Sequence, residues 1–261
     1  MRELERNLPS SSSRPDVAIV GAGRLGTALT AALREAGYDV DGPLGRGTSP
    51  EKADVVLLCV PDQEIAAAAA ALTPSPDAPQ RLVGHCSGAT GLEPLEPHQA
   101  FSLHPLMTVT SQGARFAGAG AAISGTSERA LAMARELAAA LGMRPVEIAA
   151  RDRVAYHAAA SIASNFLITV EAAAERVAAT AGLDRALLTP LVRATVENWA
   201  AVGPERALTG PVARGDEETV VRQRAELATR TPELLELFDA LTKATRSLAH
   251  ERHGELAEVS R

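Results

Sequence analysis

Short apolar segments alternate with amphipathic segments over the first 150 residues of the chain. The first of them, Val17–Val20, is followed by apolar residues at helical spacing as far as Gly37, which predicts a buried strand and then a helix. The segment 53–60 is apolar throughout, which is typical of a strand in a parallel sheet that is covered on both faces. The same pattern predicts further strands at 38–44, 82–86, 101–106, 119–124 and 144–148, and further helices at 63–72 and 128–141. This alternation predicts an α/β fold with a doubly wound parallel sheet.

The pattern changes at Arg151, after which only helices are predicted. Residues 151–181 contain no Gly or Pro and predict one helix of about 46 Å, at about 1.5 Å per residue. Three more helices are predicted at 184–202, 217–229 and 232–250. We therefore expect a disordered polar tail at 1–14, an α/β domain at 15–150 and an all-helical domain at 151–261.

The loop after the first strand holds Gly21, Gly23 and Gly26 in G-x-G-x-x-G spacing. In a Rossmann fold the first glycine permits a tight turn, the second lets the backbone approach a pyrophosphate, and the third lets the helix pack on the strand. Arg24 and Leu25 begin the helix, whose N-terminal N–H groups and partial positive charge favour a phosphate. The motif lies between a strand and a helix and therefore predicts dinucleotide binding. The alternative is a glycine-rich turn without a ligand.

The end of the second strand indicates which nicotinamide cofactor to expect. An acidic residue there binds the ribose 2′-hydroxyl of NAD, whereas an arginine accommodates the 2′-phosphate of NADP. Asp41 lies inside the predicted strand, while Arg46 follows the end of the strand. We therefore predict that the cofactor is NADP (NADPH) and that Arg46 binds it, with a solvated Arg46 as the alternative.

The carboxyl ends of the strands in an open α/β sheet face the ligand. Val60 and Pro61 end the third predicted strand, and Ser87 and Gly88 follow the fourth, so we expect all four beside the nicotinamide half of the cofactor. His104 lies near the end of the next strand. It is a candidate proton donor, and the alternative is a structural histidine that bonds the sheet edge.

The predicted long helix carries a polar stripe of His157, Ser161, Ser164 and Asn165, at i, i+4, i+7 and i+8. Polar groups on an otherwise apolar face either line a cavity or satisfy one another. The stripe therefore predicts a substrate pocket, with interhelical hydrogen bonds as the alternative. We expect His157 to act as a proton donor and Asn165 to orient a carbonyl or carboxylate group.

A turn-rich segment between two predicted helices contains Arg214 and Asp216. Arg214 suits a substrate carboxylate, which it would bind through two hydrogen bonds, while a local ion pair with Asp216 is the alternative. No metal site is predicted from His85, Cys86 and His104. Their spacing matches no common zinc pattern, and adjacent residues of one strand point to opposite faces.

The composition narrows the class of protein. The chain has 261 residues, of which 46% are hydrophobic, and a formal net charge of −6. This charge gives no general attraction to nucleic acid or to an anionic membrane. No segment approaches the 18 or more consecutive apolar residues of a membrane-spanning helix. The two cysteines lie in predicted buried strands and suggest no disulfide framework, so we expect a cytoplasmic protein.

The sequence resembles bacterial Rossmann-like proteins that carry a C-terminal domain of unknown function 2520. These in turn resemble pyrroline-5-carboxylate reductase and the 6-phosphogluconate and β-hydroxyacid dehydrogenases. The resemblance extends over about 16–227. It is carried by GAGRLG (21–26), HCSGAT (85–90), SLHPLMT (102–108), YHAAASIASN (156–165) and, most specifically, ALTGPVARGD (207–216). It implies a helical domain that forms a homodimer, and an active site between the two domains.

The sequence departs from these relatives at two positions. β-Hydroxyacid dehydrogenases carry a catalytic lysine four residues before an asparagine, and the matching residues here are Ser161 and Asn165. A serine is a poor proton donor without a partner, which argues against lysine-type alcohol chemistry. Gln223 stands where the resemblance implies a histidine.

Together these features predict an NADPH-dependent oxidoreductase that acts on a C=O or C=N group of a small polar metabolite that bears a carboxylate. The candidate catalytic residues are His157, Asn165, Ser161 and His104, and Ser164, Arg214 and Asp216 are candidates for substrate binding. The alternative is a non-catalytic protein that binds NADP as a sensor or regulator. The missing lysine favours this alternative, and the polar stripe argues against it.

Overall fold

The computed structural model describes residues 14–45, 47–48, 50–72, 80–110 and 113–259, with side chains as far as residue 251. The chain divides into two compact units, Met1–Ser164 and Asn165–Arg261. The domain boundary was expected after residue 150, and the structure instead assigns the following helical segment to the first unit. Arg46 and residues 1–13 of the expected tail lie outside the described residues.

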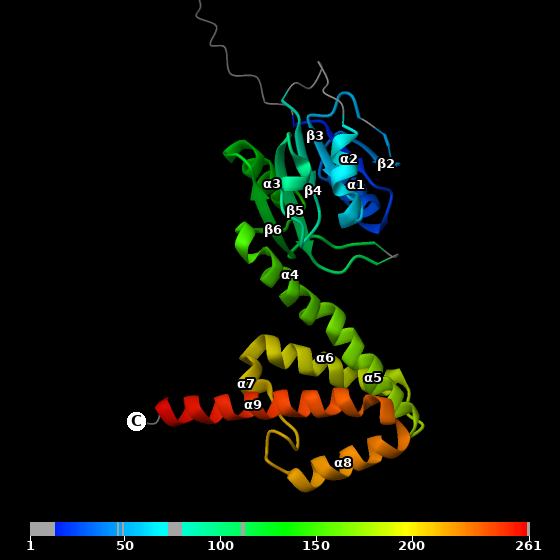
Figure 1. The fold of residues 1–261 in the computed structure, drawn as a ribbon, viewed down its shortest axis with the longest axis vertical. Coiled ribbons are helices and arrows are strands. Elements are labelled where there is room, and N and C mark those ends of the chain that lie inside the picture. Colours follow the sequence, from blue (N-terminus) through cyan, green and yellow to red (C-terminus); the bar gives the residue numbers. More distant parts are fainter. Residues whose placement is uncertain (1–13, 46, 49, 73–79, 111–112, 260–261) are drawn as a thin grey trace, which may run out of the picture. The chain divides into compact units, whose positions relative to one another are not determined.

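The described residues of the first unit form one seven-stranded sheet (Figure 1). Its strand order is β2-β1-β3-β4-β5-β6-β7. The strands are β1 (Val17–Val20), β2 (Val40–Leu44), β3 (Val55–Leu58), β4 (Leu82–His85), β5 (Gln99–Leu106), β6 (Gly120–Gly125) and β7 (Arg144–Glu147). The predicted Rossmann-type α/β fold is confirmed.

The last two strands differ from the all-parallel prediction. Strands β1 to β5 are parallel, whereas β6 pairs with β5 in antiparallel fashion and β7 runs parallel to β6. Parallel neighbours need a crossover connection, usually a helix. The described residues between β5 and β6 contain no helix, so the chain returns beside β5 in the opposite direction.

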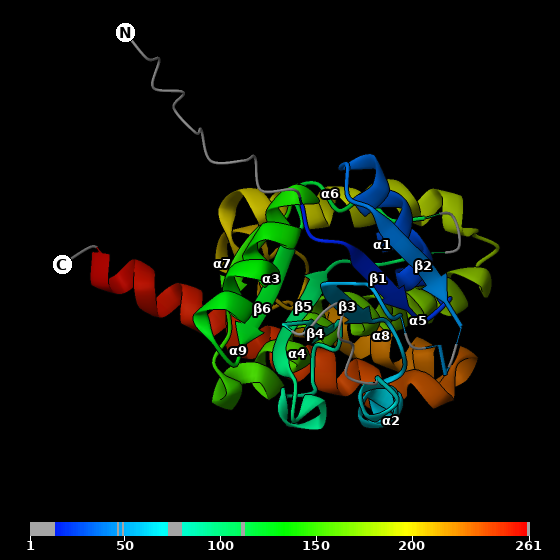
Figure 2. The ribbon, with the colours of Figure 1, turned by 90° about the horizontal axis from the view of Figure 1, so that it is seen from above.

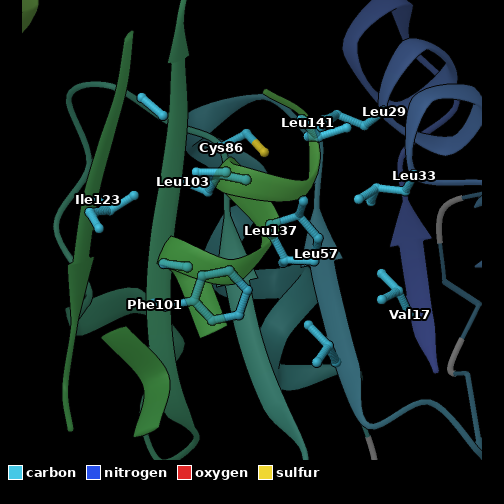
Figure 3. Close-up of a cluster of buried hydrophobic side chains, with 14 of the residues drawn as sticks. Val17, Leu29, Leu33, Leu57, Cys86, Phe101, Leu103, Ile123, Leu137 and Leu141 are labelled. Atoms are coloured by element: carbon cyan, nitrogen blue, oxygen red, sulfur yellow. The ribbon is translucent and has the colours of Figure 1, made fainter. Parts of the chain in front are cut away.

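Helices cover both faces of the sheet (Figure 2). One face packs against α1 (Arg24–Glu35) and α3 (Glu128–Ala140), through residues such as Leu33 and Leu137. In Figure 3, Leu137 lies near Leu57 and Phe101 of the sheet, and Leu33 lies on the side of Val17. The other face packs against α2 (Ile65–Ala70) and the 3-10 turn Glu93–Leu95. Two covered faces explain why β1, β3 and β4 are apolar throughout or nearly so.

The predicted long helix is present but irregular. It begins with the 3-10 turn Ala150–Asp152 and α4 (Arg153–Ser161) and ends with α5 (Leu167–Ala179). Between them, Ile162–Phe166 is π-helical. A π-helical turn closes i→i+5 hydrogen bonds, so ordinary α-helical spacing does not relate side chains on its two sides. The stripe predicted from His157 to Asn165 ends inside this turn, and Asn165 is exposed whereas His157, Ser161 and Ser164 are half-buried.

The second unit is helical as predicted. Asp184 caps the helix α6 (Arg185–Val202) by accepting a hydrogen bond from the Leu187 N–H, and Gly203 ends this helix with φ +80°. The remaining helices are α7 (Pro204–Ala207), α8 (Glu217–Arg230) and α9 (Leu235–Val259). Among the described residues, no helix is both long enough and apolar enough to span a membrane. The cytoplasmic location stays a prediction.

Candidate functional site

The glycine loop after β1 has the geometry that its spacing predicts. Gly21 has φ +120°, and a Cβ there would lie 2.3 Å from the Cys59 carbonyl oxygen. A Cβ on Gly26 would lie 1.9 Å from the Gly21 carbonyl oxygen, so the start of α1 packs directly on the loop. Gly23 is exposed, and a Cβ there would meet no atom within 4 Å. The backbone at Gly23 is therefore open to a ligand at the N-terminus of α1.

Two cavities lie beside this loop, and Val60 lines both of them. One has a volume of about 240 Å³ and extends along α2. Its lining residues are Val20, Gly47, Thr48, Val60, Glu64, Ala67, Ala68 and Ala71. The other has a volume of about 450 Å³ and connects the glycine loop with the carboxyl ends of β3, β4 and β5. It is lined by Gly23, Arg24, Leu25, Cys59, Val60, Pro61, Asp62, Cys86, His104, Pro105, Met107 and Val109, and we call it the loop cavity.

His104 projects from β5 into the wall of the loop cavity. Its Nδ1 atom lies 2.7 Å from the phenol oxygen of Tyr156 on α4, and the two rings meet edge-on with centroids 5.6 Å apart. Burial lowers the pKa of His104 to about 4, and the charges of His157 and Arg153 add to this effect. The carboxylate of Asp62 opposes it. His104 is therefore neutral at pH 7, with one N–H donor and one acceptor nitrogen.

Arg153, one turn before Tyr156, is only 3% exposed. Its guanidinium donates hydrogen bonds to the Ser87 carbonyl oxygen at 3.1 Å, to Ser124 Oγ at 2.8 Å and to Ser102 Oγ. None of these acceptors is charged, and in the described part of the chain Arg153 forms no ion pair. Burial lowers its pKa, but an arginine keeps its charge at pH 7. A positive charge is therefore held inside the first unit, close to His104.

Gly88 makes room for two imidazole rings. A Cβ at this position would lie 2.6 Å from Cδ2 of His157 and 2.9 Å from Nε2 of His104. The two rings have centroids 6.0 Å apart. Gly88 was expected beside the nicotinamide, and the structure shows that it contacts both candidate histidines.

Ser87 connects the ends of two strands. Its hydroxyl donates to Asp62 Oδ2 at 2.7 Å and accepts hydrogen bonds from the N–H groups of Ala89 and Thr90. The hydroxyl therefore shapes the turn after β4 and does not line either cavity. The loop cavity is lined by Val60, Pro61, Gly23, Arg24 and Leu25, and their contact with a cofactor stays a prediction.

Two thiols also lie at the loop cavity. Cys59 and Cys86 follow paired positions of β3 and β4, and their Sγ atoms are 3.8 Å apart. Contact with Cys59 and burial raise the pKa of the Cys86 thiol well above its ordinary value. Both cysteines are free, and among the described residues no group of three or more His, Cys, Asp or Glu could hold a metal ion.

The remaining candidate residues belong to the second unit. Asn165 is exposed in the π-helical turn, and Arg214 is exposed beside a cavity of about 260 Å³ that Arg246 and His250 also line. Asp216 accepts a hydrogen bond from the Thr219 N–H at 3.1 Å and so caps α8. Asp216 therefore has a local structural use, and the substrate roles of these residues stay predictions.

Sequence reasoning did not identify Arg153, Tyr156, Ser102 and Ser124 as site residues. One signal was available, because Arg153, Tyr156 and His157 lie at i, i+3 and i+4 and so share a helix face. The two serines gave no such signal. They face each other, with Ser102 Oγ 2.8 Å from Ser124 Oγ, only because β5 and β6 pair in antiparallel register.

Comparison with known proteins agrees with this architecture. A family model described as "Domain of unknown function (DUF2520)" matches residues 119–245, from β6 into α9. The chain is a Rossmann-like protein with a DUF2520 domain. A search of curated proteins finds no match to it.

Several solved structures are similar to this DUF2520 protein. A "putative NADP oxidoreductase" from Bacteroides fragilis is 20% identical with a TM-score of 0.76, over 89% of this chain and 98% of its own. A protein from Thermotoga maritima is 26% identical with a TM-score of 0.72, over 91% and 99%. Pyrroline carboxylate reductase from Plasmodium falciparum, solved with NADP bound, is 13% identical with a TM-score of 0.56, over 90% and 98%. At such identities the likeness shows the fold.

Proposed function

We propose that this DUF2520 protein is an NADPH-dependent oxidoreductase that reduces a C=O or C=N group of a small polar metabolite. The observation that carries the proposal is the loop cavity, in which the glycine loop and His104 line one space of about 450 Å³. A dinucleotide site and a group able to exchange protons thus meet at the carboxyl ends of the strands, where open α/β sheets bind ligands.

The two cavities suit the two halves of a dinucleotide. Gly23 and the N-terminus of α1 would bind the pyrophosphate between them. The cavity along α2 would take the adenosine half, and the loop cavity would take the nicotinamide half next to Val60 and Pro61. Bound NADPH would supply a hydride there. Two of the similar structures support NADP as the cofactor, because one is described as an NADP oxidoreductase and the other was solved with NADP bound. The position of Arg46 in the sequence supports the same choice.

The substrate would be held by groups that the resemblance and the sequence suggest. Asn165 would orient its reacting group, Arg214 would bind its carboxylate, and Ser161 and Ser164 would line the pocket. His157, beside Gly88 and His104, would act in proton exchange. These assignments place a proton donor at the site although the lysine of β-hydroxyacid dehydrogenases is replaced by Ser161.

We also propose that the second unit forms a homodimer. Leu187 and Leu191, one turn apart on α6, are 63% and 66% exposed, and Trp199 is 57% exposed. Exposed apolar side chains on one helix are typical of a surface that another protein covers. The same unit also has an apolar cavity of about 450 Å³ between α5, α8 and α9.

Replacing Gly23 tests the proposed cofactor site. A Cβ at Gly23 meets no protein atom, so Gly23→Ala fits the free protein and intrudes only where a pyrophosphate would lie. We expect the dissociation constant for NADPH to rise at least about tenfold, as measured by the fluorescence of bound NADPH. Gly120→Ala in β6 is the matched control, because a Cβ there makes only ordinary contacts with Leu106. An equal effect of the two substitutions, or no effect of either, would argue against this site.

A further inference from the structure

A hydrogen-bonded pair of side chains, His104 and Tyr156, begins at the loop cavity. His104 lines the cavity, and Tyr156 lies behind it, with its phenol oxygen 2.7 Å from His104 Nδ1. Tyr156 is not among the residues that line the cavity. A molecule in the cavity can therefore contact His104, whose Nδ1 atom contacts the phenol of Tyr156.

A fixed positive charge stands next to this pair. Arg153 is buried and donates hydrogen bonds to the neutral oxygens of Ser87, Ser102 and Ser124. Burial raises the pKa of Tyr156 above its ordinary value, and the charge of Arg153 opposes this increase by favouring the phenolate. Glu93 favours the charge of Arg153 but forms no ion pair with it among the described residues. Keeping an arginine in the interior without a carboxylate in direct contact costs free energy, since three neutral acceptors replace only part of its hydration. A charge held at such a cost can stabilise negative charge that develops beside it.

This inference rests on the proposed function and names the class of its substrate. We propose that the reacting group is a carbonyl and that His104 and Tyr156 deliver the proton to its oxygen. The neutral His104 accepts a hydrogen bond from the Tyr156 hydroxyl at Nδ1 and presents its N–H at Nε2. His104 is then the catalytic acid, and Tyr156 replaces the proton that His104 gives up. Arg153 is a positioning residue that acts through Tyr156.

The proton and charge balance of the step is complete. As the carbonyl carbon gains the hydride, the C=O π electrons move to oxygen, which takes the Nε2 proton of His104. The Tyr156 hydroxyl releases its proton to Nδ1, so His104 stays neutral and Tyr156 becomes a phenolate beside Arg153. Solvent later protonates Nε2 of His104, and Nδ1 returns its proton to the Tyr156 phenolate, which restores both residues. The products are an alcohol and the oxidised cofactor.

The same charges disfavour an iminium substrate. An iminium is already positive, and after it receives a hydride it becomes a neutral amine that needs no proton. Arg153 would repel it, and the His104–Tyr156 pair would have no proton to deliver. The groups that face His104 are His157, Arg153 and His85, which lower its pKa, and Asp62, which raises it. Of these, the carboxylate of Asp62 alone would favour a cation, and it is bound to the Ser87 hydroxyl.

The two tyrosines of the chain provide a matched pair of variants. Tyr156→Phe removes the hydroxyl that bonds His104, and Tyr38→Phe removes the one that bonds Glu136 Oε1 at 2.9 Å. Both variants and the unaltered protein are assayed for NADPH oxidation with 2-oxopentanoate, a panel of aldehydes and other 2-oxo acids, and the cyclic imine 1-pyrroline-2-carboxylate. We expect carbonyl reduction to fall at least about 100-fold in Tyr156→Phe, with NADPH affinity unchanged, and to persist in Tyr38→Phe. Reduction of the imine alone or of no compound, or equal rates in the two variants, would overturn the inference.

A second measurement does not depend on turnover. In a Tyr38→Phe background, the absorbance of tyrosinate near 295 nm reports Tyr156 alone. Replacing Arg153 by Gln is expected to raise the pKa of Tyr156 by at least about one unit, because the charge that stabilises the phenolate is gone. Arg153→Lys keeps a positive charge and should therefore reverse most of this increase in pKa. An unchanged pKa would overturn the role of Arg153. A protein that fails to bind NADPH at all would instead refute the proposed function, so the two failures are distinguishable.

Discussion

The two units of this DUF2520 protein bury apolar side chains to very different extents. In the first unit, the largest side chains of the sheet and of α1 and α3 are almost fully buried, including Phe101, Leu57 and Leu137. In the second unit, the described residues of α5 and α6 include none that is buried, and Leu191 is 66% exposed. The first unit has a core of its own, while the second leaves apolar surface that a partner would cover.

The difference also separates the chemistry. The neutral His104, the buried Arg153 and the loop cavity all belong to the first unit. Burial there lowers the pKa values of both side chains. The ion pairs of the second unit, such as Arg224–Asp239, are half-exposed and contribute little to stability. The groups that transfer protons are therefore expected from the first unit, and assembly from the second.

The largest expected effect is on the stability of the core. Leu57→Ala removes a fully buried side chain between the sheet and its helices, so the free energy of unfolding should fall by about 3 kcal/mol. Leu191→Ala, which truncates an exposed side chain of the same type, should cost less than about 1 kcal/mol in the monomer. Denaturant unfolding at low protein concentration measures both. If both variants lost the same free energy of unfolding, the two units would not differ in how they bury apolar side chains.

A second prediction concerns pH. The unfolded chain binds a proton at His104 below its ordinary pKa of 6.5, while the folded chain does so only below about 4. Stability should therefore rise with pH between about 4 and 6.5, by on the order of 3 kcal/mol from this residue, and fall as the pH is lowered through that range. Urea unfolding from pH 4 to 7 measures the slope. His104→Gln should reduce it, and an unaltered slope would show that His104 is not neutral in the folded protein.

A third prediction concerns assembly. Leu191→Asp places a charge on the exposed apolar face of α6, so it should weaken the homodimer at least about tenfold. Val146→Asp in β7, which is 55% exposed in the first unit, is the matched control and should leave the dimer intact. Sedimentation velocity over a range of concentrations distinguishes the two. A monomeric parent protein at all concentrations would contradict the proposal.

The fold of the first unit was predictable because its local signals agree with its packing. The apolar runs of β1, β3 and β4 lie between two helical layers, and Gly21, Gly23 and Gly26 each occupy the position that their spacing predicts. The reversed direction of β6 and β7 was not predictable, since strand direction depends on pairing between distant residues.

The candidate site was only partly predictable. His104 and His157 were identified from residue type and helical spacing. The buried network of Arg153 with Ser102 and Ser124 joins residues of three separate elements. No local sequence pattern therefore predicts this network. The π-helical turn at Ile162–Phe166 likewise shifted the expected stripe, because ordinary α-helical spacing assumes an unbroken α-helix.

The most direct test of the account is a fluorescence titration of the purified protein with NADPH and with NADH. We expect saturable binding of NADPH in the micromolar range or below, and at least about tenfold weaker binding of NADH, because Arg46 follows β2 in the sequence, where an arginine accommodates the 2′-phosphate. Equal binding of the two cofactors would contradict the role of Arg46. Binding of neither would contradict the central claim that the loop cavity is a dinucleotide site.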